Sequence, residues 1–148
     1  MKNEIYSKCL HTLDEKIQTM QDMLAELKTS IMSDTKSSAG DKHETGRAMA
    51  QIEIENNQGQ LNEVLKMKET LLRIIPDQAH KKIQLGSVVH TNRGNFYIAV
   101  PIGKIKLNSG EEYYVTSASS PLAQILIGHK RSDEVLFDAQ MLTILNVE

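Results

Sequence analysis

The sequence predicts an α+β protein, in which a long N-terminal antiparallel coiled-coil hairpin precedes a small antiparallel β-sheet domain with one short helix. Two observations predict this class. In the first half, apolar residues recur at alternating steps of four and three, the heptad pattern of paired helices. After Pro76 the apolar period falls close to two, in short runs separated by turns that contain glycine, as in β-hairpins. We therefore expect residues 1–79 to form the hairpin and residues 80–148 to form the sheet domain.

Each expected helix carries its own heptad series. The first runs through Tyr6, Leu10, Leu13, Ile17, Met20, Leu24, Leu27 and Ile31. The second has two polar members and runs through Ala50, Ile54, Asn57, Leu61, Val64, Lys68, Leu71 and Ile75. Antiparallel pairing sets the start of one series opposite the end of the other, so the chain would double back around residues 40 and 41, beside Ser37, Ser38 and Gly40. A parallel coiled coil with a partner chain is the alternative that the same heptads allow.

The expected tip of the hairpin carries two acidic residues in the stretch GDKHET, residues 40–45. Asp41 and Glu44 are three apart, so on a helix they lie on one face, with Cβ atoms roughly 5 to 6 Å apart. One interpretation is a capping box, in which each side chain binds the backbone N–H of the other residue. The other is a carboxylate pair that shares a divalent cation with further acidic groups. Two carboxylates alone make a poor Mg²⁺ site, so the arm would have to deliver them to other ligands.

The second half begins where Pro76 should end the second helix and a polar linker follows, residues 77–82. We expect strands at residues 87–91, 95–100, 104–107, 111–115, 134–137 and 142–147. Between the fourth and fifth strands, Ser120 and Pro121 are typical of a helix start, and Gly128 is a plausible stop. This short helix is expected to cover the sheet.

Composition limits the possible functions. The 17 Lys and Arg residues against 19 Asp and Glu residues give a net charge of -2, so nonspecific attraction to nucleic acid is not expected to drive binding. The single cysteine, Cys9, excludes an internal disulfide and a multi-thiolate metal site. No stretch approaches the roughly 20 apolar residues of a membrane span, and the N-terminal residues are too polar for a signal peptide. We therefore expect a cytoplasmic protein without membrane partners.

Two stretches resemble a known family. The tip GDKHET, followed by Gln58 and Gly59, and the segment SPLAQILIGHKRSDEV at residues 120–135 are similar to the bacterial Gre transcript cleavage factors. The resemblance covers both halves of the chain, and the second stretch is its more specific part. The chain departs from the family pattern after the tip, where Thr45, Gly46, Arg47 and Ala48 follow, and at Ile125 and Ser132.

The resemblance implies a fold and a partner. It implies an N-terminal coiled coil that enters the secondary channel of RNA polymerase, and a C-terminal domain like that of FK506-binding proteins that docks at the channel rim. It implies that Asp41 and Glu44 help to hold the second Mg²⁺ of the polymerase, which then cleaves the 3′ end of a backtracked transcript. The residues that it implies for docking are Ser120, Pro121, Leu122, Lys130 and Asp133. We expect a monomer with no tightly bound cofactor, which reaches the nascent RNA only indirectly.

Three functions remain open from the sequence. The first is a polymerase accessory factor with no active site of its own, which stimulates transcript cleavage. The second is a regulator that occupies the same channel and inhibits or modulates the polymerase without stimulating cleavage. The third is a prolyl isomerase built on the C-terminal domain, which the fold analogy alone suggests. Composition speaks against the third, because the second half has only five aromatic residues with which to line a proline pocket: Phe96, Tyr97, Tyr113, Tyr114 and Phe137.

Overall fold

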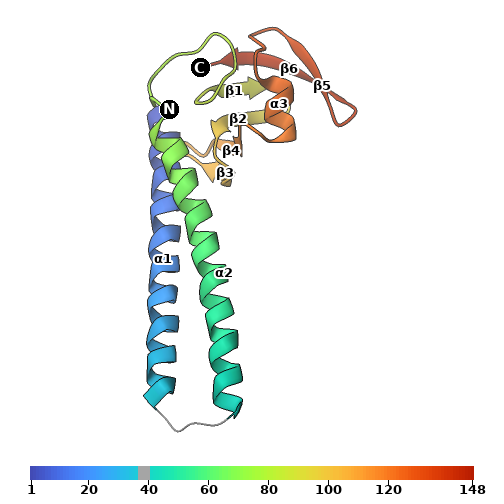
Figure 1. The fold of residues 1–148 in the computed structure, drawn as a ribbon. Helices are drawn as coiled ribbons and strands as arrows, with labels where there is room; N and C mark the ends of the chain where they lie inside the picture. The colour runs from blue at the N-terminus through green and yellow to red at the C-terminus, as the bar shows by residue number, and fades with distance from the viewer. Residues whose placement is uncertain (37–40) are drawn as a thin grey trace. The chain divides into compact units, whose positions relative to one another are not determined.

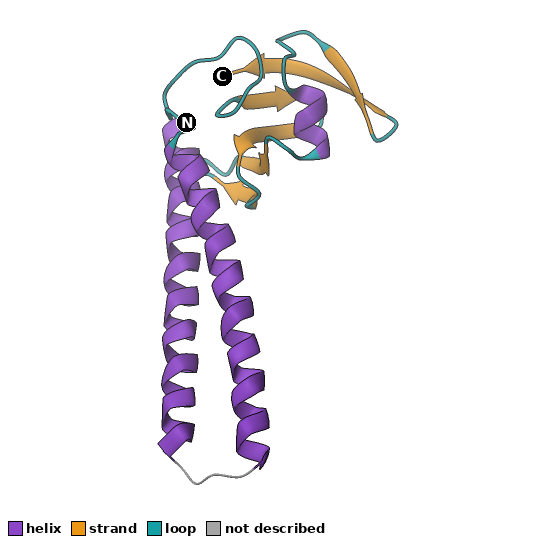
Figure 2. Cartoon of the chain, in the orientation of Figure 1, coloured by secondary structure: helices purple, strands orange, loops and turns teal. Residues whose placement is uncertain are grey.

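A computed structural model describes residues 1–36 and 41–148, with side chains for residues 1–32 and 45–148. The chain order is two long helices, four strands, a short helix and two strands (Figures 1 and 2). It divides into two compact units. The sheet unit comprises Met1–His11 and Glu69–Glu148, and the helical unit comprises Thr12–Lys68. The α+β class is thus confirmed, while the division between residues 79 and 80 stays a prediction.

The helical unit contains most of α1 (Lys2–Lys36) and α2 (Asp41–Leu72). Near one end of the unit, Lys68 Nζ lies 2.6 Å from Asp14 Oδ1, and near the other Ile31 lies beside Gln51 and Ile54 around a shared hollow. The two helices therefore run in opposite directions in this unit, as Figure 1 shows. Heptad positions supply its buried side chains: Leu13, Ile17, Leu24, Ile54, Leu61 and Val64. Packing of these residues as a coiled coil stays a prediction.

The second long helix ends earlier than the sequence predicts. Regular α-helix stops at Leu72, whereas the heptad series and Pro76 place the end at Ile75. The backbone N–H of Arg73 donates to the carbonyl of Thr70 (3.2 Å), and that of Ile74 donates to Leu71 (3.0 Å), so the last turn tightens. Ile75 precedes the proline, where helical backbone is sterically disfavoured, and it is exposed.

The sheet has six strands in the order β3-β4-β2-β1-β6-β5. Their bounds are Val88–Thr91 (β1), Gly94–Ala99 (β2), Gly103–Lys106 (β3), Glu112–Ser117 (β4), Glu134–Phe137 (β5) and Gln140–Val147 (β6). The short helix α3 (Pro121–Leu126) lies between β4 and β5 in the chain. Each of these elements overlaps a segment that the sequence predicts, so the predicted elements of the second half are confirmed.

One strand pairing corrects the prediction of an antiparallel sheet. β2 and β4 are parallel, with Phe96 opposite Tyr114 and Ile98 opposite Thr116, while the other pairings are antiparallel. The chain leaves β2, passes to β3 at the edge of the sheet, and returns in β4 between them. β3 runs opposite to β2, and the reversal from β3 into β4 restores the direction of β2.

The sheet is covered on both faces. On one face α3 buries Ala123 and Leu126 against strand residues, among them Val89, Ile98 and Ile144. The first turns of α1 lie near the opposite face, because Cys9 lies close enough to Tyr97 of β2 to act on its phenol, and Met1 lies beside Tyr113 of β4. Glu4 also accepts a hydrogen bond of 2.7 Å from the backbone N–H of Asn108, in the turn after β3. Ile5 and Cys9 are fully buried there, whereas the heptad residues Tyr6 and Leu10 are only half-buried. The start of α1 thus presents a different face from the one that the heptad pattern predicts.

Candidate functional site

The short helix α3 begins as the sequence predicts. The hydroxyl of Ser120 accepts a hydrogen bond of 3.1 Å from the backbone N–H of Ala123, and Pro121 occupies the first helical turn. The cap gives a hydrogen-bond acceptor to a backbone N–H in the first turn, which has no partner within the helix. Proline costs no hydrogen bond here, because a backbone N–H at this position would have no partner within the helix either. The helix then buries Ala123 and Leu126, which fixes the orientation of its exposed side. Ser120, Pro121 and Leu122 are therefore held rigidly at one corner of the sheet unit.

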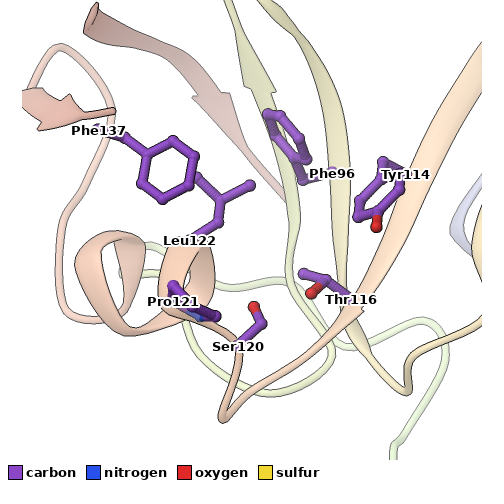
Figure 3. A pocket seen from close by; sticks show the side chains of 7 residues that line it. All are labelled: Phe96, Tyr114, Thr116, Ser120, Pro121, Leu122 and Phe137. Carbon is purple, nitrogen blue, oxygen red and sulfur yellow. The ribbon is translucent and has the colours of Figure 1, made fainter. Parts of the chain in front are cut away.

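An open apolar cavity of about 400 Å³ lies beside this corner. It is lined by Phe96, Tyr114, Thr116, Ser120, Pro121, Leu122 and Phe137. Figure 3 shows Leu122 and Phe137 facing Phe96 across the hollow. The lining thus comes from β2, β4, the start of α3 and the end of β5. Three of the five docking residues that the resemblance implies contribute to this cavity.

The shape and composition of this cavity suit an apolar side chain. Its volume falls in the range of small ligand pockets, and its lining is mostly carbon. The hydroxyl oxygen of Ser120 already accepts the hydrogen bond that caps α3, and few other polar groups line the cavity. Burial of one large apolar side chain here would contribute about 1.5 to 3 kcal/mol.

The other two docking residues occupy the loop between α3 and β5. The carboxylate of Asp133 accepts a hydrogen bond of 3.0 Å from the backbone N–H of Lys130 and lies 3.2 Å from Nδ1 of His129. The backbone N–H of Lys130, followed by the His129 ring, holds the pKa of Asp133 below its ordinary value. Asp133 therefore stabilises the loop between α3 and β5. The side chain of Lys130 is exposed, and neither residue lines the cavity.

A second, smaller cavity of about 240 Å³ adjoins the first, because Phe96 and Tyr114 line both. Its other lining residues are Arg93, Gly94, Asn95, Lys104, Glu112 and Tyr113. The sequence predicts no polymerase-docking role for Phe96, Tyr114, Thr116 or Phe137. The parallel pairing of β2 with β4 brings Phe96, Tyr114 and Thr116 together, and Phe137 comes from the end of β5. Hydrophobic periodicity in the sequence does not reveal this arrangement.

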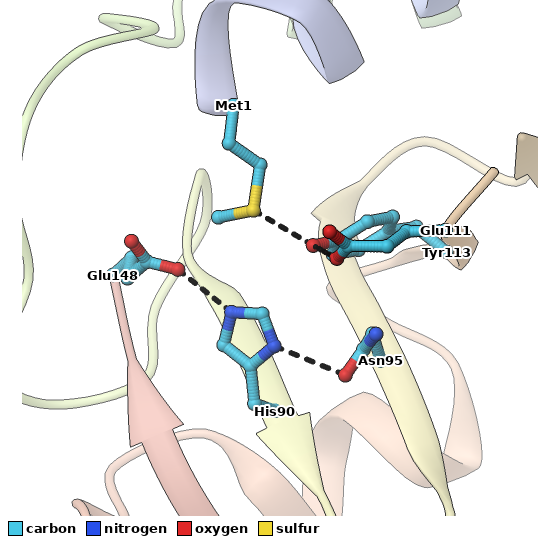
Figure 4. Close-up of polar contacts among 6 residues, drawn as sticks. All are labelled: Met1, His90, Asn95, Glu111, Tyr113 and Glu148. Atoms are coloured by element: carbon cyan, nitrogen blue, oxygen red, sulfur yellow. Dashed lines mark hydrogen bonds and ion pairs between the residues drawn. The ribbon is translucent and has the colours of Figure 1, made fainter. Parts of the chain in front are cut away.

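A polar cluster adjoins the second cavity, because two of its members, Asn95 and Tyr113, also line that cavity; Figure 4 shows the contacts within the cluster. Nδ1 of His90 lies 3.0 Å from Oδ1 of Asn95, and Nε2 lies 2.7 Å from the carboxylate of Glu148. The hydroxyl of Tyr113 donates to Glu111 (2.9 Å) and lies beside the sulfur of Met1. Burial and the neighbouring Glu111 raise the pKa of Tyr113, so the phenol stays protonated. These contacts hold Asn95 and Tyr113 in place.

The acidic pair at the start of α2 cannot be placed in the same way. The backbone of α2 begins at Asp41, but the side chains of Asp41 and Glu44 lie outside the described residues. Among the side chains that the structure describes, no group of three or more His, Cys, Asp or Glu residues is arranged to hold a metal ion. Cys9 is buried, and burial raises its pKa to about 12.

Comparison of the chain with models of known protein families and with curated proteins gave no match. Within the described parts of the chain, no helix is long and apolar enough to cross a membrane.

Proposed function

We propose that this chain is a Gre-like transcription elongation factor that binds RNA polymerase and stimulates cleavage of backtracked RNA by the polymerase itself. In this proposal the two long helices form the coiled coil that enters the secondary channel. The sheet unit, with a fold like that of FK506-binding proteins, docks at the channel rim. The chain has no active site of its own.

The observation that carries the proposal is the cavity beside α3. Ser120, Pro121 and Leu122 come from the segment that resembles the Gre factors, and they line an open apolar hollow of about 400 Å³. A capped helix start in that segment has a purely structural explanation, but an open cavity lined by three aromatic residues does not follow from capping. Tyr114 is 49% exposed, so this wall is available to a partner.

The two long helices support the proposal through their length and through the position of the acidic residues in α2. α1 has 35 residues and α2 has 32, which corresponds to roughly 50 Å of helix each at 1.5 Å per residue. Asp41 is the first residue of α2, and Glu44 follows within the first turn. The positive end of a helix favours carboxylates at these positions. Two helices of this length, with acids at the start of the second, suit a coiled coil that carries negative charge into a channel.

The chemistry of the donor set fits a shared Mg²⁺ ion. Carboxylate oxygens are the ligands that Mg²⁺ prefers, but two of them are too few for a site of their own. Asp41 and Glu44 would therefore hold the ion only together with the acidic groups of the polymerase. When bound there, the second Mg²⁺ supplies activation of the attacking water.

A cleavage assay on stalled transcription complexes tests the proposal. The wild-type chain should shorten the RNA from its 3′ end, and the double variant Asp41→Ala, Glu44→Ala should lose this activity but still bind polymerase. Glu53→Ala with Glu55→Ala, which removes two acids further along α2, is the matched control and should retain cleavage. If the tip variant cleaves like the wild type, the proposed role of the carboxylates is wrong. Inhibited synthesis without shortened RNA would favour the channel-binding regulator.

The aromatic lining of the cavity favours one second candidate, the binding of proline-containing peptides. Phe96, Tyr114 and Phe137 are three of the five aromatic residues of the sheet half, and all line the hollow. Aromatic grooves are a common way to recognise proline-rich segments. Measured isomerisation of a proline peptide, lost on Phe137→Ala, would support this candidate over polymerase docking.

A further inference from the structure

The second cavity places two cations next to the aromatic wall of the first. Lys104 pairs with Tyr114 across β3 and β4, and Tyr114 pairs with Phe96 across β4 and β2. These three residues therefore form one row across the sheet, with their side chains on the same face. Arg93 occupies the turn that leads into β2 and lines the same cavity. The aromatic pair thus separates an apolar hollow from a cationic one.

The two cations differ in how free they are. Nζ of Lys104 lies 3.5 Å from the carboxylate of Glu112, and both side chains are more than half exposed. Such a pair is weak, but it offsets the charge of Lys104. The backbone N–H of Arg93 donates to the hydroxyl of Thr91 (3.1 Å). Its guanidinium has no hydrogen bond or ion pair within the described residues. The guanidinium N–H groups of Arg93 are therefore available to bind a partner.

We infer that the two cavities form one docking surface, which accepts a large apolar side chain in the first cavity and a carboxylate at Arg93 in the second. This inference rests on the proposed function in taking RNA polymerase as the partner, and it adds that the contacted polymerase surface is acidic beside its apolar contact. Guanidinium groups bind carboxylates through two parallel hydrogen bonds, which fixes the orientation of the partner. Arg93 is a specificity-determining residue in this arrangement.

The charges around the second cavity favour an acidic protein surface over nucleic acid. A nucleic-acid backbone needs a row of cations to neutralise successive phosphates. Here Glu111 and Glu112 lie in or beside the same cavity, and the whole chain has a net charge of -2. One free guanidinium and one partly neutralised ammonium match a single carboxylate better than a polyanion.

Measured affinity for RNA polymerase tests the inference. Arg93→Glu should raise the dissociation constant about tenfold or more, because a repulsion replaces an ion pair. It should also make binding less sensitive to added salt. Glu112→Gln should tighten binding, because it frees Lys104 from its carboxylate. Arg73→Ala, an exposed arginine at the end of α2 and outside both cavities, is the control and should bind like the wild type.

The outcomes separate this inference from the proposed function. If the wild type binds polymerase and Leu122→Ala weakens binding, but Arg93→Glu and Glu112→Gln have no effect, the inference is overturned and the proposed function stands. If the wild type does not bind polymerase, both fall. If a single-stranded RNA oligomer binds the wild type alone and Arg93→Glu abolishes that binding, the ligand is nucleic acid and the inference is overturned. Circular dichroism checks that each exposed-site variant keeps its fold.

Discussion

Phe96 and Tyr114 lie directly opposite each other on the parallel strands β2 and β4, with their rings edge to face and the ring centroids 6.4 Å apart. The planes of the two rings are 77° apart, a favourable geometry for aromatic pairs. Since both residues line both cavities, this pair forms the wall between the apolar and the cationic hollow. The one parallel pairing of the sheet thus creates the proposed docking surface.

Tyr114→Ala should weaken polymerase binding more than it weakens the fold. The side chain is 49% exposed, so its removal should cost less than about 1 kcal/mol of unfolding free energy. Aromatic side chains at the centre of an interface often contribute more than that to binding, so we expect the dissociation constant to rise about tenfold. Leu136→Ala is the control, because Leu136 is 62% exposed and lies outside both cavities. Equal affinities for the two variants would contradict the role of Tyr114.

Ser120→Ala should destabilise the sheet unit by about 1 kcal/mol, because it removes the acceptor of the Ala123 N–H at the start of α3. Ser120→Asp keeps an oxygen acceptor at the cap and should retain most of the stability. Denaturant unfolding of the three proteins measures the difference. If Ser120→Asp keeps the fold but loses polymerase binding, repulsion between the added carboxylate and the acidic partner surface explains the loss. If Ser120→Ala and the wild type have the same free energy of unfolding, the cap does not stabilise the sheet unit.

The sequence predicts the elements of this chain better than their arrangement. Heptad steps and strand alternation are local patterns, so α1, α2 and the strands could be placed, and the Ser120 cap follows from two adjacent residues. The parallel neighbour of Phe96 could not be placed, because strand order depends on contacts between segments far apart in the chain. The same holds for Ile5 and Cys9, whose burial depends on the strands that cover the start of α1.

The candidate site was predictable only in part, for the same reason. Ser120, Pro121 and Leu122 are contiguous and lie in the stretch that resembles the Gre factors, so the resemblance implies a docking role for this corner. The remaining walls of the cavity come from three strands, and no spacing in the sequence joins Phe137 to Phe96. Arg93 sits in a hairpin turn, where an exposed cation is ordinary, so only its position beside the aromatic pair marks it.

Tyr97→Phe should stabilise the protein. The hydroxyl of Tyr97 is buried without a hydrogen-bond partner in the described part of the chain, and burial raises the pKa of this phenol. An unsatisfied buried hydroxyl costs about 1 to 3 kcal/mol, so its removal should raise the free energy of unfolding by about 1 kcal/mol. Tyr113→Phe is the matched change. The Tyr113 hydroxyl donates a hydrogen bond to Glu111, so its removal should lower the free energy of unfolding. Urea unfolding of both variants measures the two signs, and destabilisation by Tyr97→Phe would show that its hydroxyl has a partner.

The stability of the sheet unit should fall as the pH falls below about 6.5, because His80 is buried as a neutral ring. Its Nδ1 lies 2.8 Å from the hydroxyl of Ser87, which is itself buried. Burial, followed by the positive charge of Lys2, lowers the pKa of His80 from its ordinary value of 6.5. The unfolded chain therefore binds a proton more readily than the folded chain does between the folded pKa and 6.5. Stability is full above 6.5 and decreases as the pH drops through that window, by at most about 1.4 kcal/mol per pH unit for one group.

Unfolding free energies at pH 7.5 and pH 5.5 measure this effect. His80→Gln, which cannot take up the proton, should lose less stability between the two pH values than the wild type does. His11→Gln, which changes an exposed histidine of α1, should keep the wild-type pH dependence. The linker residue His80 would then be a main source of acid sensitivity, because protonation adds a positive charge to a buried ring that the charge of Lys2 already opposes. An unchanged pH profile in His80→Gln would show that the buried ring does not control stability in this range.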